Sequence, residues 1–94
     1  MRVFKYSLSE NLLSANDVVS MHGENPKVVH VGPDPGTGAL CVWAEVDESQ
    51  PLHTHDCLIR GTGHPSPGPE YRHIGSAICG SLVWHVYSRT LVRR

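Results

Sequence analysis

The fold of this chain is decided by residues 74–87, which read Ile74-Gly-Ser-Ala-Ile-Cys-Gly-Ser-Leu-Val-Trp-His-Val-Tyr87. Gly80-Ser81 stands between two apolar segments and is a Gly-X pair, which favours a two-residue hairpin turn of type II′. With these two residues as the loop, the register of the two strands is fixed. The predicted pairs across the hairpin are Cys79/Leu82, Ile78/Val83, Ala77/Trp84, Ser76/His85, Gly75/Val86 and Ile74/Tyr87.

Both faces of this predicted hairpin are largely apolar. On one face small residues oppose large ones, as a packed core prefers, because Ala77 lies opposite Trp84 and Gly75 opposite Val86. A sheet with one solvated face would alternate apolar and polar residues, and the second face does not. We therefore expect the N-terminal segment, folding over it as a sandwich, or a second copy of the chain to cover that face. The residues predicted to lie in such an interface are Ile74, Ile78, Val83 and Tyr87.

The rest of the chain repeats this composition in short segments. Runs rich in Val, Ile, Trp and Tyr are separated by Pro and Gly, which is typical of strands joined by turns. Ser9–Asn16 is expected to be a loop with room for one helical turn. The predicted strands, of which the last two form the hairpin, are Val3–Leu8, Asp17–Met21, Lys27–Val31, Ala39–Asp47, Asp56–Thr62, Tyr71–Cys79 and Leu82–Ser88. Six or seven such strands predict an all-β fold, a small antiparallel sandwich or a partly open barrel.

The length of the chain limits it to one domain. Its 94 residues suffice for a single small core, and we expect residues 1–94 to form one all-β domain with residues 89–94 as a basic C-terminal tail. A core of this size buries only about 60–65% of the surface of the unfolded chain, so an isolated monomer would be marginally stable. We therefore expect a homo-oligomer.

Charge and cysteine content exclude several classes of function. Eight Lys and Arg against nine Asp and Glu give a net charge of −1, which argues against nucleic acid as a partner. The three cysteines form no CxxC pair and predict a reducing cytoplasm rather than a disulfide framework. No run of 18 apolar residues occurs, so no membrane span is expected. No cofactor is predicted.

One cluster carries residue types that bind metal. In a strand, His53, His55 and Cys57 would project to the same side, and all three side chains are zinc ligands. Completing a site would require Cys41, His30 or Asp56 to lie near them. The alternative interpretation is an exposed polar segment after Pro51 with solvated histidines.

The glycine-rich turn of residues 61–65 is a second candidate. Its glycines would let a ligand approach the backbone, and Arg60, Thr62 and His64 could bind a small anionic metabolite or nucleotide. It lacks the sequence of a P-loop or a dinucleotide-binding turn. The alternative is a tight turn that leads from a strand into the following Pro-rich loop.

No pattern points to catalysis. His85 is predicted opposite Ser76, which is more typical of a hydrogen-bonded structural histidine than of a catalytic base. No acid and base pair is apparent, so we expect a protein that is not an enzyme. Trp43 projects from the face of residues 39–47 opposite to Val42 and Ala44, and is predicted in an interface. The alternative for Trp43 is a place in a second core layer.

Three motifs in this order carry a family resemblance: Trp43-Ala-Glu-Val-Asp47, Gly61-Thr-Gly-His-Pro65 and Leu82-Val-Trp-His85. Over residues 25–88 the chain resembles a family of short bacteriophage-encoded proteins of unknown function. The resemblance implies a phage origin and a role in the cytoplasm of the infected bacterial host, and it implies no activity. Small non-structural phage proteins commonly bind a host component. Protein binding is therefore the predicted function.

Overall fold

Seven β-strands make up the described part of the chain. The computed structural model describes residues 1–8 and 16–91, and these contain strands and turns but no helix. None of these residues therefore forms a helix able to cross a membrane. The predicted all-β class is confirmed. The strands are β1 (Arg2–Ser7), β2 (Asn16–His22), β3 (Lys27–Pro33), β4 (Leu40–Val46), β5 (Leu52–Gly61), β6 (Arg72–Cys79) and β7 (Leu82–Leu91).

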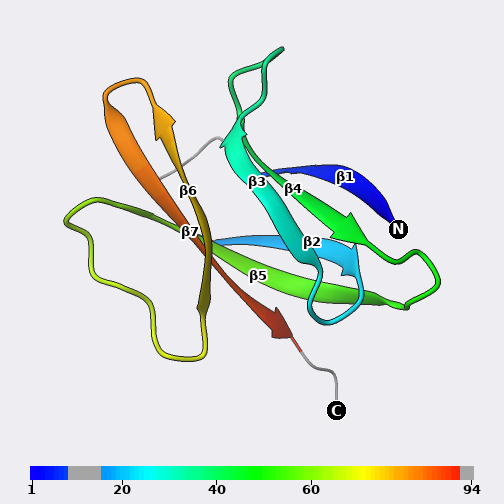
Figure 1. Cartoon of the computed structure of the whole chain (residues 1–94). Helices are drawn as coiled ribbons and strands as arrows, with labels where there is room; N and C mark the ends of the chain where they lie inside the picture. Colours follow the sequence, from blue (N-terminus) through cyan, green and yellow to red (C-terminus); the bar gives the residue numbers. More distant parts are fainter. Residues whose placement is uncertain (9–15, 92–94) are drawn as a thin grey trace.

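The strands form two sheets that face one another as a sandwich. One sheet has three strands in the order β1-β4-β3, and the other has four in the order β2-β5-β7-β6 (Figure 1). All neighbouring strands are antiparallel. The chain enters the three-stranded sheet with β1 and moves to the other sheet with β2. The N-terminal strand thus belongs to the layer that packs against the inner face of the β6–β7 hairpin.

The core lies between the two sheets. Val31, Leu40 and Val42 of the three-stranded sheet meet Ile59 and other residues of the four-stranded sheet. Val42 is fully buried, and burying a Val side chain contributes about 1.5–3 kcal/mol. A second, smaller cluster extends this core toward one end of the sandwich. The remaining members of the two clusters are Leu8, Cys57, Ala77, Trp84 and Val86 in the first, and Met21, Ala44 and Val46 in the second.

Gly75 allows the two sheets to approach at one edge. A Cβ atom added to Gly75 would overlap the side chain of Val31 on the opposite sheet. Any larger residue at position 75 would therefore push β6 away from β3. Because β3 and β6 are the edge strands of their sheets, this contact determines the distance between the two sheets along that edge.

The predicted hairpin register is correct up to Gly75. Gly80 has φ +64° at the turn, as a type II′ loop requires at its first position, and the pairs from Cys79/Leu82 to Gly75/Val86 are all observed. The last predicted pair is wrong, since a bulge lies between His73 and Gly75 and Tyr87 pairs with His73. Ile74 is the extra residue.

The bulge changes the side to which Ile74 belongs. Its side chain is half-buried and packs against the main core cluster rather than on the outer face beside Tyr87. An additional residue in one strand inverts the alternation of all residues before it. The gain in apolar burial gives a physical reason for the irregularity, which pairing rules alone do not predict.

Most strand boundaries differ from those predicted by one or two residues, and two differ by more. Strand β5 begins at Leu52 rather than at Asp56, and β7 continues to Leu91 rather than ending at Ser88. The two extensions pair with each other, with His55 opposite Thr90, and the extension of β7 also places Arg89 opposite Asp56. Arg89 is therefore part of the sheet and not of a basic tail. Residues 92–94 of the expected tail, and residues 9–15 of the expected loop, lie outside the described residues.

Candidate binding surfaces

A row of hydrogen-bonded polar side chains crosses the outer face of the four-stranded sheet. Thr62 Oγ1 lies 3.3 Å from His85 Nε2, and His85 Nδ1 lies 2.8 Å from Ser76 Oγ. Ser76 Oγ also lies 2.9 Å from His73 Nε2. The strand register explains this row, since Ser76 pairs with His85 and His73 with Tyr87. The hydrogen bond expected of His85 as a structural histidine opposite Ser76 is observed.

The donor and acceptor roles along this row of hydrogen bonds can run in either of two directions. Each hydroxyl has one hydrogen and each neutral imidazole has one N–H group. Thr62 can donate to His85, His85 to Ser76 and Ser76 to His73, or all three bonds can run the other way. Ser76 is therefore engaged on both sides, and the row joins β5, β7 and β6 on the outer face.

The turn after β5 uses its own polar groups. The Gly61 N–H donates to His64 Nδ1 at 3.0 Å, and the His64 N–H donates back to the Gly61 carbonyl at 3.1 Å. Arg60 donates to the carbonyls of Pro65 and Ile59 at 3.1 and 3.2 Å. Arg60 and His64 thus shape a tight turn, while Thr62 belongs to the polar row. Binding of an anion by these three residues stays a prediction.

His53, His55 and Cys57 do lie on one side of β5, as the strand pattern predicted. That side faces the core: His55 is 3% exposed and Cys57 is fully buried. His55 Nε2 lies 3.1 Å from the Gly23 carbonyl and Nδ1 lies 3.3 Å from Thr90 Oγ1. Cys57 Sγ lies 4.0 Å from Ser88 Oγ. Each ring nitrogen of His55 thus lies within hydrogen-bond distance of an oxygen of the protein.

The additional metal ligands considered for this cluster lie elsewhere. Cys41 is on β4 of the other sheet and contacts Ser7, while His30 is stacked against Trp43. Asp56 projects to the opposite face of β5. Across residues 1–8 and 16–91, no group of three or more His, Cys, Asp and Glu side chains has an arrangement that could hold a metal ion. Zinc binding stays a prediction without further support.

Burial lowers the pKa of His55 below its ordinary value of 6.5, because desolvation opposes the charged imidazolium. The hydrogen bond to the Gly23 carbonyl acts in the other direction but is the smaller effect. The Thr90 hydroxyl donates its one hydrogen to the carbonyl of Glu24 at 2.6 Å. His55 and Thr90 together fasten the β2–β3 turn to the end of the four-stranded sheet.

Sequence reasoning missed a cluster around Asp56. The Tyr71 hydroxyl donates to Asp56 Oδ2 at 2.6 Å, and Arg89 Nη2 lies 3.8 Å from the same oxygen. The Arg89 guanidinium also lies over the Tyr71 ring, 5.1 Å from its centroid. This hydrogen bond raises the pKa of Tyr71, since removing its proton would place two negative charges together. Only the longer β5 and β7 strands bring Asp56 and Arg89 side by side.

Trp43 and the hairpin lie on separate surfaces. Trp43 belongs to neither core cluster and is half-buried on the outer face of the three-stranded sheet, where its ring lies 5.1 Å from that of His30. Tyr87 lies on the outer face of the other sheet, with its ring 5.3 Å from that of His73. One flat contact surface could not include both. The interface role of Trp43 stays a prediction.

The turn end of the β6–β7 hairpin exposes large aliphatic side chains. Ile78 is 70% exposed and Leu82 is 55% exposed, and their neighbour Val83 is also exposed. Ile78 and Val83 are paired on the outer face, whereas Leu82 projects to the other side. Figure 1 shows this end of the hairpin lying clear of the three-stranded sheet. In the following text these three residues are called the hairpin end.

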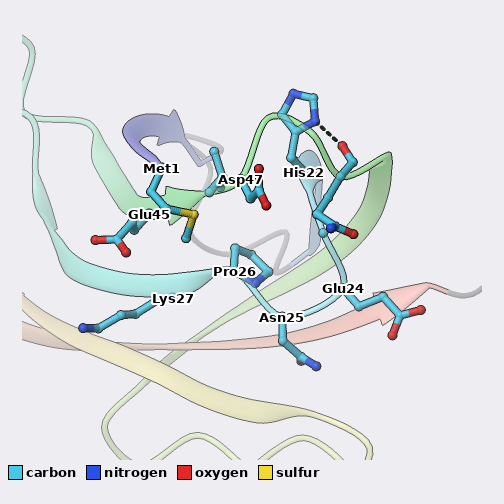
Figure 2. Close-up of a pocket in the computed structure, with 11 residues that line it drawn as sticks. Met1, His22, Glu24, Asn25, Pro26, Lys27, Glu45 and Asp47 are labelled. Atoms are coloured by element: carbon cyan, nitrogen blue, oxygen red, sulfur yellow. Dashed lines mark hydrogen bonds between the residues drawn. The ribbon is translucent and has the colours of Figure 1, made fainter.

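A shallow hollow of about 280 Å³ lies at the opposite end of the sandwich, beside the turn after β2. Figure 2 shows the Met1 side chain and the Pro26 ring facing each other across it, with Glu45 and Glu24 directed away to either side. His22 Nδ1 lies 2.7 Å from the Gln50 carbonyl at its rim. These groups close the end of the molecule, and their charges are not aimed at a common point.

The fold defines a small two-sheet antiparallel β-sandwich with outward-facing polar and apolar surfaces. The chain belongs to the family described as a domain of unknown function (DUF7352), whose model matches residues 1–93. This agrees with the expectation of an uncharacterised family. No curated protein and no solved structure matches the chain.

Proposed function

We propose that this protein acts without catalysis, by protein–protein interaction, as a bacteriophage accessory protein that binds a host bacterial component in the cytoplasm of the infected cell. The observation that carries the proposal is the hairpin end, Ile78, Leu82 and Val83, which gathers exposed aliphatic side chains on two adjacent strands. The phage setting rests on the resemblance of the three motifs to phage-encoded proteins.

The hairpin end has the properties of a contact surface. Isolated aliphatic residues are common on protein surfaces, but adjacent ones with a polar border mark sites of association. The polar row with Ser76 and His85 forms such a border on the outer face. Covering a residue as exposed as Ile78 would contribute on the order of 1–2 kcal/mol. Self-association through the same surface would produce the expected homo-oligomer.

A four-residue comparison tests this proposal. The double variant Ile78→Ser/Val83→Ser removes two of the three side chains of the hairpin end, and the control Val18→Ser/Leu52→Ser removes two exposed aliphatic side chains elsewhere. Proteins captured from host lysate by the wild type are purified and their affinities for each variant measured. We expect the hairpin variant to bind its partner about tenfold or more weakly and the control to bind normally.

Light scattering of the same three proteins measures self-association. A mass that falls to that of the monomer only in the hairpin variant would identify a second copy as an occupant of this surface. A host partner that binds all three proteins equally, or no reproducible partner together with no effect of expression on host growth, would contradict the proposed function.

A further inference from the structure

A cleft of about 300 Å³ lies where the edge strands of the two sheets meet. One wall is formed by the β2–β3 turn and the start of β3, and the other by the start of β6. Lys27 and Arg72 line it from opposite sides, together with Asn25 and His73. No acidic side chain from the described residues lines this cleft.

The two cations in the cleft differ from most others in the molecule. Arg2, Lys5 and Arg89 each lie within 4 Å of a carboxylate. Within the described part of the chain Lys27 and Arg72 have no such partner, although Glu45 is the register partner of Lys27 across the strands. Two positive charges on neighbouring strands, neither paired with a carboxylate, would attract an anion from solution.

Arg72 is held in place for this role. Its Nη1 donates to Asn25 Oδ1 at 3.3 Å, which ties β6 to the β2–β3 turn across the cleft. The bulge at Ile74 places Arg72 opposite Ser88, on the inner side of the sheet. A guanidinium has five N–H groups, so most remain for a ligand. The Asn25 amide group, whose oxygen is occupied, can donate as well.

The size of the cleft suits a small molecule. Its volume is at the lower end of the range of about 300–1,000 Å³ found for small-molecule sites. Val28 and Ile74 add apolar surface beside the charges. A tetrahedral phosphate matches the arrangement, because a guanidinium binds two of its oxygens while an ammonium group meets another as a point charge.

We propose that the cleft between β3 and β6 binds the phosphate group of a small phosphorylated molecule, with Lys27 and Arg72 as its cationic contacts. The site differs from the anion site predicted at Arg60, Thr62 and His64. It also lies apart from the hairpin end, so the proposal does not rest on the proposed protein-binding function.

Nuclear magnetic resonance titration tests the site directly. Isotope-labelled protein is titrated with inorganic phosphate, with phenyl phosphate and with phenol. We expect both phosphates to shift the backbone amide signals of Asn25, Lys27 and Val28 and of residues 72–74, and phenol to leave them unchanged. Signals that move over the whole surface, or equal binding of phenol and phenyl phosphate, would overturn the proposal.

Matched variants separate the cleft from general charge attraction. Lys27→Gln and Arg72→Gln are each expected to raise the dissociation constant of phenyl phosphate about tenfold. Lys5→Gln removes one positive charge from β1, at the opposite edge of the three-stranded sheet from β3, and is expected to change the dissociation constant by less than about twofold. Equal weakening by all three would contradict a local site. Arg72→Lys keeps the charge and provides a second, less disruptive variant, which we expect to bind with intermediate affinity.

Discussion

The inner and outer faces of the β6–β7 hairpin are built from alternating residues of the same two strands, yet they are completed in different ways. The inner face packs Ala77, Trp84 and Val86 against the opposite sheet. The outer face changes along its length, from exposed Ile78 and Val83 at the turn to hydrogen-bonded polar side chains further along. Packing within the chain therefore accounts for one face only, and the hairpin end has no covering partner among the described residues.

The largest loss in the free energy of unfolding is expected from a substitution on the inner face of the hairpin. Trp84→Ala removes a buried aromatic side chain from the core between the sheets, and such truncations cost about 3–5 kcal/mol. Urea unfolding measures the loss. A loss below about 1 kcal/mol would show that the two sheets do not depend on this core.

The close approach at Gly75 gives the next largest effect. Gly75→Ala forces the added methyl group against Val31, and we expect the free energy of unfolding to fall by about 1–3 kcal/mol. The double variant Gly75→Ala/Val31→Ala makes room for that methyl group. If the two losses simply add in the double variant, the clash with Val31 is not their cause.

Acid should lower the free energy of unfolding through His55, which lies on the inner side of the neighbouring strand β5. The folded-state pKa lies below 6.5, so above pH 6.5 the imidazole is neutral in both states and no stability is lost. Below pH 6.5 the unfolded chain takes up a proton more readily, and the free energy of unfolding falls by up to about 1.4 kcal/mol per pH unit until the folded-state pKa is reached.

His55→Gln isolates this contribution from that of the other histidines. Urea unfolding of both proteins at pH 7.5 and pH 5.5 should show a smaller loss of stability on acidification in the variant. Equal losses in the two proteins would mean that His55 titrates alike in the folded and unfolded states.

The smallest effect on stability is expected on the outer face. Ile78→Ser replaces a side chain that is mostly in solvent, so the free energy of unfolding of the isolated monomer should change by less than about 0.5 kcal/mol. A dilution series monitored by circular dichroism checks this. A large loss that disappears at low protein concentration would instead reveal stabilisation by a second copy.

Local patterns predicted the inner face well. The Gly80-Ser81 turn and the alternation of small and large residues determine the register from Cys79/Leu82 to Gly75/Val86. Pairing rules could not predict the bulge at Ile74, because its cause is packing against a core that distant strands supply.

Sequence reasoning was weaker where polar residues are buried. The segment from Leu52 to His55 has the composition of an exposed loop, yet His55 is buried, with its ring nitrogens beside the Gly23 carbonyl and the Thr90 hydroxyl. The cleft between β3 and β6 could not be predicted from the sequence, since Lys27 and Arg72 belong to different sheets. These two residues come close only because of how the two sheets are placed relative to each other.

The bulge at Ile74 accommodates one extra residue in β6. In a regular ladder that kept every residue, Ile74 would pair with Tyr87, His73 with Ser88 and Arg72 with Arg89, and Arg72 would lie on the outer face. The bulge absorbs this shift and leaves Arg72 opposite Ser88 on the inner side. Deletion of Ile74 would keep His73 opposite Tyr87 and Arg72 opposite Ser88, so a chain of this family that is one residue shorter at this point would lose an apolar contact with the core and retain the positive charge of the cleft.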